Sequence, residues 1–338
     1  MASSCVPNRL TRKVRVVQRA DRGRCLETTS SVAAGDIILA ETPVCWWVDA
    51  EQRDHVCAHC LGVIGAENSA TAPQCAGCGQ VRWCCARCKE DDTRHAMVCN
   101  QLAAAKTVDG PSPAEKEVVS LLYFVAHASA LRRSDPRAFA QLWSLMYGSQ
   151  VQLSDEEVVS CRTIAAALLK AAPEDAAWFS EEVVMELCRK DKTCNFAVSM
   201  PPDEQAKAED VDSVDRLPRA YACYPFLSLA NHGCLPTAAR FDHFDVPLDT
   251  RGVVYSPELY APEGVRVGSL VAASHEEVSR PPHSLAVRLV ALHALPPGSE
   301  VLITYMPPGD DYGMRQVLGV ASCAACVNRW WAGWWAGW

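Results

Sequence analysis

The sequence of 338 residues predicts an α+β protein, in which small β-sheets are interrupted by a metal-binding segment and by a helical insert. Short strand-like runs near both ends of the chain are bounded by glycine, proline or charged residues. Eight cysteine and histidine residues of metal-ligand type lie close together before residue 100. Residues 101–187 contain only two glycines, and their apolar side chains recur every three or four positions, which favours helices.

Near the N-terminus, residues 14–17 and 36–40 have the pattern of strands, with a turn at residues 33–35. Arginine and lysine residues are frequent in the first 24 positions, and we expect them to form a solvated face beside a strand.

The eight candidate ligands follow the spacing C-x2-C, C-x2-C, C-x3-C and H-x3-C. They are Cys57, Cys60, Cys75, Cys78, Cys84, Cys88, His95 and Cys99. A structural zinc takes four nitrogen or sulfur ligands in a tetrahedron, so eight ligands imply two closed sites. So short a segment cannot bury a self-sufficient core, and metal binding would supply much of its folding free energy. Disulfides are the alternative, but the N-terminus lacks the apolar region of a secretory signal.

Three prolines, Pro111, Pro136 and Pro173, divide residues 101–187 into about four helices. Residues 200–219 are polar and contain proline, which is typical of a loop. Strand candidates then resume, and residues 242–283 between them form a long stretch of the kind that is functional or mobile. The strand candidates are residues 221–230, 237–241, 285–292 and 301–305.

Composition narrows the class of protein. A hydrophobic content of 49% and a charged content of 21% are typical of globular chains. The net charge of −8 argues against a general nucleic-acid binder and suits a basic protein substrate. No apolar run approaches the roughly 18 residues of a membrane span.

The spacing of the eight ligands resembles that of the MYND zinc finger, whose two sites interleave along the chain. The resemblance implies that Cys57, Cys60, Cys84 and Cys88 hold one zinc, and that Cys75, Cys78, His95 and Cys99 hold the other. MYND fingers bind proteins, typically short proline-containing peptides. A closed four-ligand zinc has no open position for catalysis, so this segment alone indicates an interaction module.

A second group of motifs resembles the SET-domain lysine methyltransferases. Residues 224–237, YPFLSLANHGCLPT, resemble the Asn-His-x-Cys-x-Pro-Asn signature, and residues 297–305, PGSEVLITY, resemble the strand that ends in the active-site tyrosine. Residues 21–24 resemble the glycine-rich start of the domain, and residues 194–196 its Asn-containing strand. The order of these pieces around the finger is similar to that of the SET and MYND domain (SMYD-type) protein lysine methyltransferases, over nearly the whole chain.

The resemblance implies the SET-domain fold, small β-sheets with a threaded C-terminal segment, and an enzyme that methylates protein lysines, histone or non-histone, with S-adenosylmethionine. Tyr305 and Tyr224 would line a narrow catalytic channel, where desolvation favours the neutral acceptor amine. The residues implied to contact the cofactor are Arg22, Gly23, Arg24, Asn195, Asn231 and His232. Glycine allows close approach of the backbone, and an arginine can pair with a carboxylate.

A third zinc is implied at Cys234, Cys323 and Cys326, one ligand short of four. The family's remaining cysteine is replaced by Ala321, which leaves water or another side chain as the fourth ligand. Thr237 stands where the family has asparagine, and residues 319–321 lack the usual aromatic. A rival interpretation therefore stays open, in which an inactive SET fold acts as a zinc-dependent interaction scaffold.

The predicted organisation has six segments. They are an N-terminal SET part (1–50), the MYND zinc finger (51–100), the helical insert (101–190), the SET core (191–306), a post-SET segment (307–329) and a Trp-rich tail (330–338). We expect a monomer in the cytoplasm or nucleus, whose partners are a protein carrying the target lysine and proline-containing peptides at the finger. The sequence names neither the substrate nor the number of methyl groups added.

Overall fold

The computed structural model describes residues 13–20, 22–147, 151–200, 218–242, 253–254, 271–272, 285 and 287–305. The chain divides into two compact units. The first unit takes Met1–Thr42, Gly148–Val151 and Pro225–Trp338, and the second takes Pro43–Tyr147 and Gln152–Tyr224. The second unit is therefore inserted in the sequence of the first.

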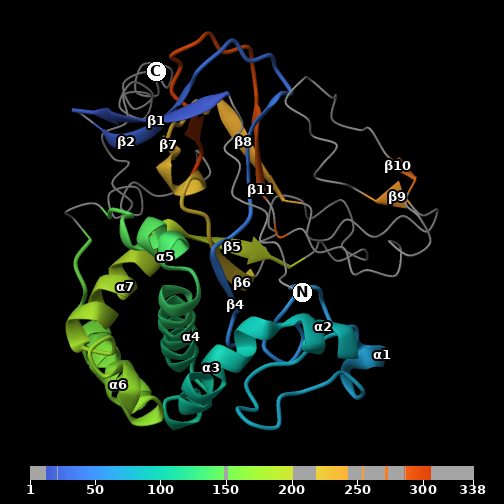
Figure 1. Cartoon of the computed structure of the whole chain (residues 1–338), viewed down its shortest axis with the longest axis vertical. Helices are drawn as coiled ribbons and strands as arrows, with labels where there is room; N and C mark the ends of the chain where they lie inside the picture. Colours follow the sequence, from blue (N-terminus) through green and yellow to red (C-terminus); the bar gives the residue numbers. More distant parts are fainter. Residues whose placement is uncertain are drawn as a thin grey trace, which may run out of the picture. The chain divides into compact units, whose positions relative to one another are not determined.

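The first unit consists of short strands in several small sheets (Figure 1). A hairpin joins β1 to β2, and a three-stranded antiparallel sheet has the order β3-β11-β8. A parallel pair joins β7 to β12, and β9 pairs with β10. The strands are β1 (Val14–Arg19), β2 (Gly23–Thr28), β3 (Ile37–Glu41), β7 (Asn231–His232), β8 (Ala238–Asp242), β9 (Val253–Val254), β10 (Val271–Ala272), β11 (Val287–Ala291) and β12 (Leu302–Ile303).

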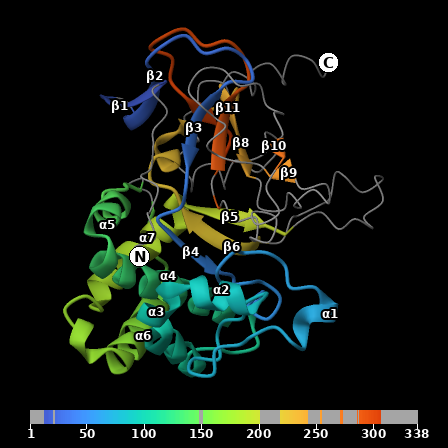
Figure 2. The same cartoon turned by 45° about the vertical axis from the view of Figure 1, so that its right-hand side comes forward.

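The core of the first unit comes from residues that are far apart in the sequence. Figure 2 shows β3, β11 and β8 side by side, and Leu39 of β3 faces Leu289 of β11 in the register. Both leucines are buried, as are Leu26 on β2 and Val301 next to β12. The Val301 N–H donates to the Leu26 carbonyl at 2.9 Å, so the chain just before β12 is fastened to the N-terminal hairpin.

The second unit is mainly helical. Its longest helix, α4, packs against α3, α5, α6 and α7 and against strand β4 (Figure 1). The α-helices are α1 (Ala66–Ser69), α2 (Ala86–Asp91), α3 (Thr93–Ala103), α4 (Pro113–Ser134), α5 (Pro136–Trp143), α6 (Asp155–Ala171) and α7 (Glu181–Cys194). The strands β4 (Cys45–Val48), β6 (Pro218–Cys223) and β5 (Asn195–Ser199) form an antiparallel sheet in that order.

The sequence explains where these helices begin. Ser112 caps α4 by accepting from the Glu115 N–H, while the Glu115 carboxylate accepts from the Ser112 N–H, which is a capping box. Asp135 caps α5, and Pro136 occupies its first turn, where a missing N–H costs no helical hydrogen bond. Pro113 begins α4 and Pro136 begins α5, whereas Pro111 precedes the cap of α4 and Pro173 begins a short 3₁₀ helix. The described residues after position 110 contain the four α-helices that the sequence predicts.

One predicted strand is shorter than expected. Residues 221–230 were expected to be extended, but β6 ends at Cys223, and Leu227–Leu229 form a short 3₁₀ helix. The buried carboxylate of Glu41 accepts the N–H groups of Phe226 and Leu227 at 2.9 and 2.7 Å, which stabilises the turn. A segment whose amides are satisfied by a side chain has no need of a strand partner.

The α+β class, with small sheets interrupted by a cysteine-rich segment and a helical insert, is confirmed. Among the described helices, none is both long and apolar enough to span a membrane. The loop predicted at residues 200–219 ends earlier than expected, because Pro218 and Arg219 begin β6. Residues 201–217, most of the stretch 243–284, and the post-SET and Trp-rich segments lie outside the described residues.

Candidate functional site

The eight candidate zinc ligands lie in two groups of four. Their membership is the one that the MYND resemblance implies: Cys57, Cys60, Cys84 and Cys88 in one group, and Cys75, Cys78, His95 and Cys99 in the other. Within each group the ligand atoms all lie within 4.8 Å of one another. Four sulfur ligands about 2.3 Å from a zinc ion lie about 3.8 Å apart. Because the two groups match this geometry, each of them could hold a zinc ion.

The distances within the groups support this fit. The Cys60 and Cys84 sulfurs are 3.8 Å apart, and those of Cys75 and Cys99 are 3.6 Å apart. Nε2 of His95 lies 3.8 Å from the Cys78 sulfur. His95 and Cys99 are four residues apart on α3, which places both side chains on one face of the helix.

Trp83 supports the finger from within. Its side chain is buried, and its indole N–H donates to the Asp92 carboxylate at 2.9 Å. Its ring meets the edge of the His95 imidazole, with 5.2 Å between centroids. Cys85 belongs to neither group, because its sulfur accepts the Cys88 N–H and caps α2.

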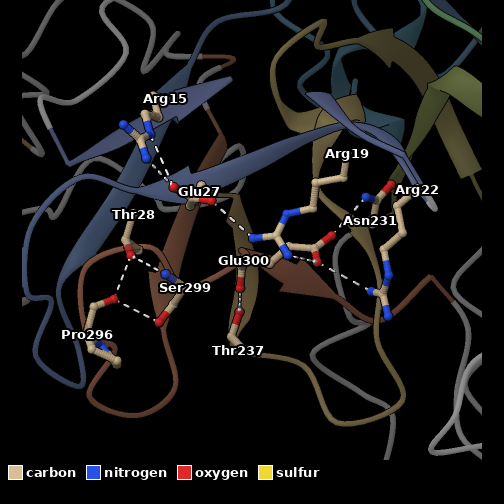
Figure 3. Close-up of polar contacts among 10 residues, drawn as sticks. All are labelled: Arg15, Arg19, Arg22, Glu27, Thr28, Asn231, Thr237, Pro296, Ser299 and Glu300. Carbon is tan, nitrogen blue, oxygen red and sulfur yellow. Dashed lines mark hydrogen bonds and ion pairs between the residues drawn. The ribbon is translucent and has the colours of Figure 1, made fainter. Parts of the chain in front are cut away.

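In the first unit, Glu300 joins two of the predicted cofactor residues (Figure 3). Its Oε1 accepts from the Asn231 carboxamide nitrogen at 2.9 Å, and its Oε2 lies 3.5 Å from the Arg22 guanidinium. Arg19 lies 3.8 Å from the same Oε2. The Glu300 side chain is only 10% exposed, so these contacts form at the edge of the core.

The hairpin carries a second acidic group beside the arginines. The carboxylate of Glu27 pairs with Arg15 at 2.5 Å and with Arg19 at 3.1 Å (Figure 3). The hydrogen bond from Arg15 holds the pKa of Glu27 below its usual value, and the bond to Glu27 raises the pKa of Arg19. Two of the basic residues near the N-terminus, Arg15 and Arg19, are thus paired within this hairpin.

Gly23 begins β2 with a φ of +71°, a conformation that favours glycine, and a Cβ there would meet none of the described residues within 4 Å. The glycine is therefore required by the turn, and the space beside it is open as far as the described residues extend. Arg24 follows on β2, opposite Gln18 of β1.

Two hydrogen bonds join Tyr305 to the signature at residues 224–237. Its backbone N–H donates to Nδ1 of His232 at 3.1 Å, and its hydroxyl donates to the Ala230 carbonyl at 2.7 Å. Nε2 of His232 lies 3.0 Å from the Cys234 sulfur. The structure thus brings together Asn231, His232, Cys234 and Tyr305, which the sequence separates by up to 74 positions.

The second unit holds the other two predicted residues. Asn195 pairs opposite Cys223 in the β5–β6 register, and Tyr224 meets the neighbouring Phe196 edge-on at 6.0 Å. The Asn195 carboxamide nitrogen donates to Asp191 at 2.8 Å, while its buried oxygen has no hydrogen-bond partner among the described residues. Burial raises the pKa of Asp191 to about 6. An acceptor left without a donor is a feature that a bound ligand could satisfy.

The sequence marks Thr237 as a departure from the family's asparagine and places Glu300 in the second signature, but it predicts no contact for either residue and does not single out Glu41. The Thr237 hydroxyl donates to the Glu300 carbonyl at 3.1 Å and accepts the Leu302 N–H at 2.8 Å. The available signal was that Glu300 and Thr237 both lie within recognised signatures, whereas no motif includes Glu41. The third zinc site was predicted to include Cys323 and Cys326, with Ala321 in place of a further cysteine. These three residues lie outside the described residues.

Comparison with known proteins agrees with these motifs. No model of a known protein family matches the chain. The chain is 25% identical over 316 residues to the Arabidopsis thaliana protein named Histone-lysine N-methyltransferase ASHR2, covering 90% of this chain and 67% of that protein.

A solved structure, the SET domain of LSMT bound to lysine and AdoHcy, is 9% identical with a TM-score of 0.35. That match covers 91% of this chain but only 52% of the other, and a likeness of this degree supports no argument about the site. The sequence relative matches the chain over most of its length, and it confirms that the chain resembles the SET-domain lysine methyltransferases.

Proposed function

We propose that this protein is an S-adenosylmethionine-dependent protein-lysine N-methyltransferase with a protein-binding zinc finger. The observation that carries the proposal is the set of hydrogen bonds that joins the signature at residues 224–237 to the signature at residues 297–305. Tyr305 is bonded to Ala230 and His232, and Asn231 is bonded to Glu300. Residues that would serve the cofactor and the acceptor amine are therefore neighbours in the first unit. The histone-lysine methyltransferase activity in the name of the Arabidopsis relative supports the same class.

The residues around Asn231 fit the cofactor's charged end. Arg22 offers a guanidinium that can pair with a carboxylate, and the open space at Gly23 lets a ligand approach the backbone. Asn231 turns its nitrogen to Glu300, which leaves its oxygen to accept from a ligand. His232 uses both ring nitrogens within the protein, so its contribution to the cofactor would come from its backbone. S-adenosylmethionine, when bound, would supply an electrophilic methyl group.

Tyr305 would act on the acceptor amine. Its hydroxyl proton is committed to the Ala230 carbonyl, so its oxygen can still accept a hydrogen bond from a neutral lysine amine. Such a bond would orient the amine's lone pair for in-line attack, which is a contribution of positioning. The lysine must lose a proton to water before it attacks, and a desolvated channel favours that loss. Tyr224 as a second channel wall and Asn195 as a cofactor contact remain part of the proposal.

The finger has a separate role in this proposal. Each four-ligand group would hold a structural zinc with no open position, so the finger would bind a protein partner through its surface. Proline-containing peptides are the partners that the MYND resemblance suggests.

The first test is calorimetric titration of S-adenosylhomocysteine into zinc-replete protein, with the metal counted on the same sample. Binding in the micromolar range with two or three zinc ions per chain is expected, and transfer of a labelled methyl group to histone and non-histone proteins would then identify the substrate. Two zinc ions without binding of S-adenosylhomocysteine would overturn the enzyme proposal and favour the interaction scaffold.

A further inference from the structure

Glu300 is bonded to Asn231 and Arg22, two of the residues that are proposed to contact the cofactor. We infer that Glu300 is a positioning residue, which fixes the Asn231 carboxamide so that its oxygen faces the cofactor. The inference rests on the proposed function, because it assigns Asn231 to the cofactor.

The carboxylate of Glu300 determines the orientation of the Asn231 carboxamide. An ionised carboxylate accepts hydrogen bonds and donates none, so Asn231 must present its nitrogen to Glu300, at 2.9 Å. The oxygen of Asn231 is then on the other side of the amide and is available as an acceptor. The bond to Glu300 is the one hydrogen bond that the described residues give to the Asn231 side chain.

The second oxygen of Glu300 is fixed independently. Oε2 faces the guanidinium groups of Arg22 and Arg19 at 3.5 and 3.8 Å, so the carboxylate cannot rotate without losing these partners (Figure 3). Arg19 also pairs with Glu27 and would keep a partner without Glu300. Asn231 has no such second partner among the described residues.

The backbone of Glu300 is held as firmly as its side chain. Its carbonyl accepts from the Thr237 hydroxyl at 3.1 Å, and the residue forms a β-bridge with Glu27 of the hairpin. The next residue, Val301, donates to the Leu26 carbonyl. A side chain that starts from a fixed backbone and ends on two fixed partners has little rotational freedom.

The variant Glu300→Gln separates positioning from simple packing, because it keeps the shape of the side chain. Glutamine has one acceptor oxygen, and the two arginines, which only donate, will take it. Its NH₂ group then faces Asn231, which must flip and turn its nitrogen outward. A ligand that donates to the Asn231 oxygen in the wild type would instead face the Asn231 NH₂ group in this variant. We expect the affinity for S-adenosylhomocysteine to fall about tenfold, as for a lost charged hydrogen bond.

The experiment compares four proteins in calorimetric titrations with S-adenosylhomocysteine: wild type, Glu300→Gln, Asn231→Ala and the double variant. If Glu300 acts through Asn231, adding Glu300→Gln to Asn231→Ala will change the affinity by about twofold or less. An undiminished tenfold loss in that background would overturn the inference, as would an unchanged affinity in Glu300→Gln alone. Glu27→Gln is the matched control, because it removes the other carboxylate that pairs with Arg19 without touching Asn231, and it should bind as wild type does.

A second measurement needs no cofactor. Selective ¹⁵N labelling of asparagine reports the carboxamide of Asn231, identified by its loss in Asn231→Ala. Its proton shifts should move in Glu300→Gln and stay in place in Glu27→Gln. If wild type fails to bind S-adenosylhomocysteine but these shifts move, the proposed function fails while the orientation of Asn231 by Glu300 stands. If the shifts are the same in all three proteins, Glu300 does not orient Asn231.

Discussion

The Tyr305 N–H donates to Nδ1 of His232 across 3.1 Å, although the two residues are 73 positions apart. A neutral imidazole carries one proton, and a nitrogen that accepts a hydrogen bond has none. The proton of His232 therefore sits on Nε2, which lies 3.0 Å from the Cys234 sulfur. In this arrangement His232 donates to the sulfur and has no lone pair there for a metal. The fourth ligand of a third zinc site would have to be another group.

Tyr305→Phe should reduce methyl transfer by at least about tenfold, because the lost hydroxyl anchors the ring to Ala230 and, in the proposed function, would accept from the amine. The loss should appear in kcat more than in the affinity for S-adenosylhomocysteine, measured by single-turnover transfer and by calorimetry. Tyr147→Phe is a suitable control, since its hydroxyl donates to Glu186 in the other unit. Unchanged rate and product state in Tyr305→Phe would show that the catalytic assignment is wrong.

Cys84→Ser and Cys85→Ser should differ in zinc content, although the two cysteines are adjacent. Cys84 belongs to one of the four-ligand groups, so its loss should remove about one zinc per chain and lower the melting temperature. Cys85 caps α2 through its sulfur, and serine is a good helix cap, so that variant should keep both ions. Metal analysis after gel filtration distinguishes them. Equal zinc content in the two variants would contradict the grouping.

Thr237→Val should destabilise the first unit by about 1–3 kcal/mol, because it leaves the Leu302 N–H and the Glu300 carbonyl without their hydroxyl partner. Thr237→Ser keeps the hydroxyl and should lose much less. Urea unfolding of both variants gives the comparison. The replacement of the family's asparagine by Thr237 would be without structural consequence if the two variants unfolded at the same urea concentration.

Glu41 should make stability fall as pH rises. Burial raises the pKa of Glu41 to about 7 from an ordinary value of 4.5, despite its two backbone hydrogen bonds. A raised pKa means that the folded state holds the proton more tightly. The stabilisation is therefore complete below pH 4.5 and lost as pH passes about 7, by up to about 3 kcal/mol.

The variant Glu41→Gln provides the reference for that profile. It places an NH₂ group against a backbone N–H and should be less stable at pH 5, yet its stability should fall less between pH 5 and 8. Urea unfolding at several pH values measures the difference between the two proteins, in which the contributions of all other titrating groups cancel. Parallel profiles would remove Glu41 as the source of the pH dependence.

Sequence alone predicted what depends on residue type and spacing. The candidate zinc ligands can be recognised from their residue types and their spacing along the chain. The two groups that the resemblance implies are the ones that lie together in the structure. The helices were predictable for a similar reason, since the apolar recurrence at three and four positions and the prolines that delimit helices such as α5 are local features. Local information is sufficient for such features.

What the sequence could not reveal depends on partners far along the chain. The turn after Cys223 was mistaken for a strand because its stabilising carboxylate, Glu41, is 185 positions from Phe226. The contacts of Glu300 and Thr237 could not be predicted for the same reason, since the contact of Glu300 with Asn231 spans 69 positions. Neither spacing nor periodicity records a contact of this kind.

The nesting of one unit within the other has a consequence during synthesis. Strand β3 leaves the ribosome early, but its partner β11 follows about 250 residues later, which takes tens of seconds at about 5–20 residues per second. The second unit, whose segments lie between them, can fold in that interval. The apolar strand β3 must therefore wait without its partner, and chaperones that shield such strands should matter for the yield of this protein in cells.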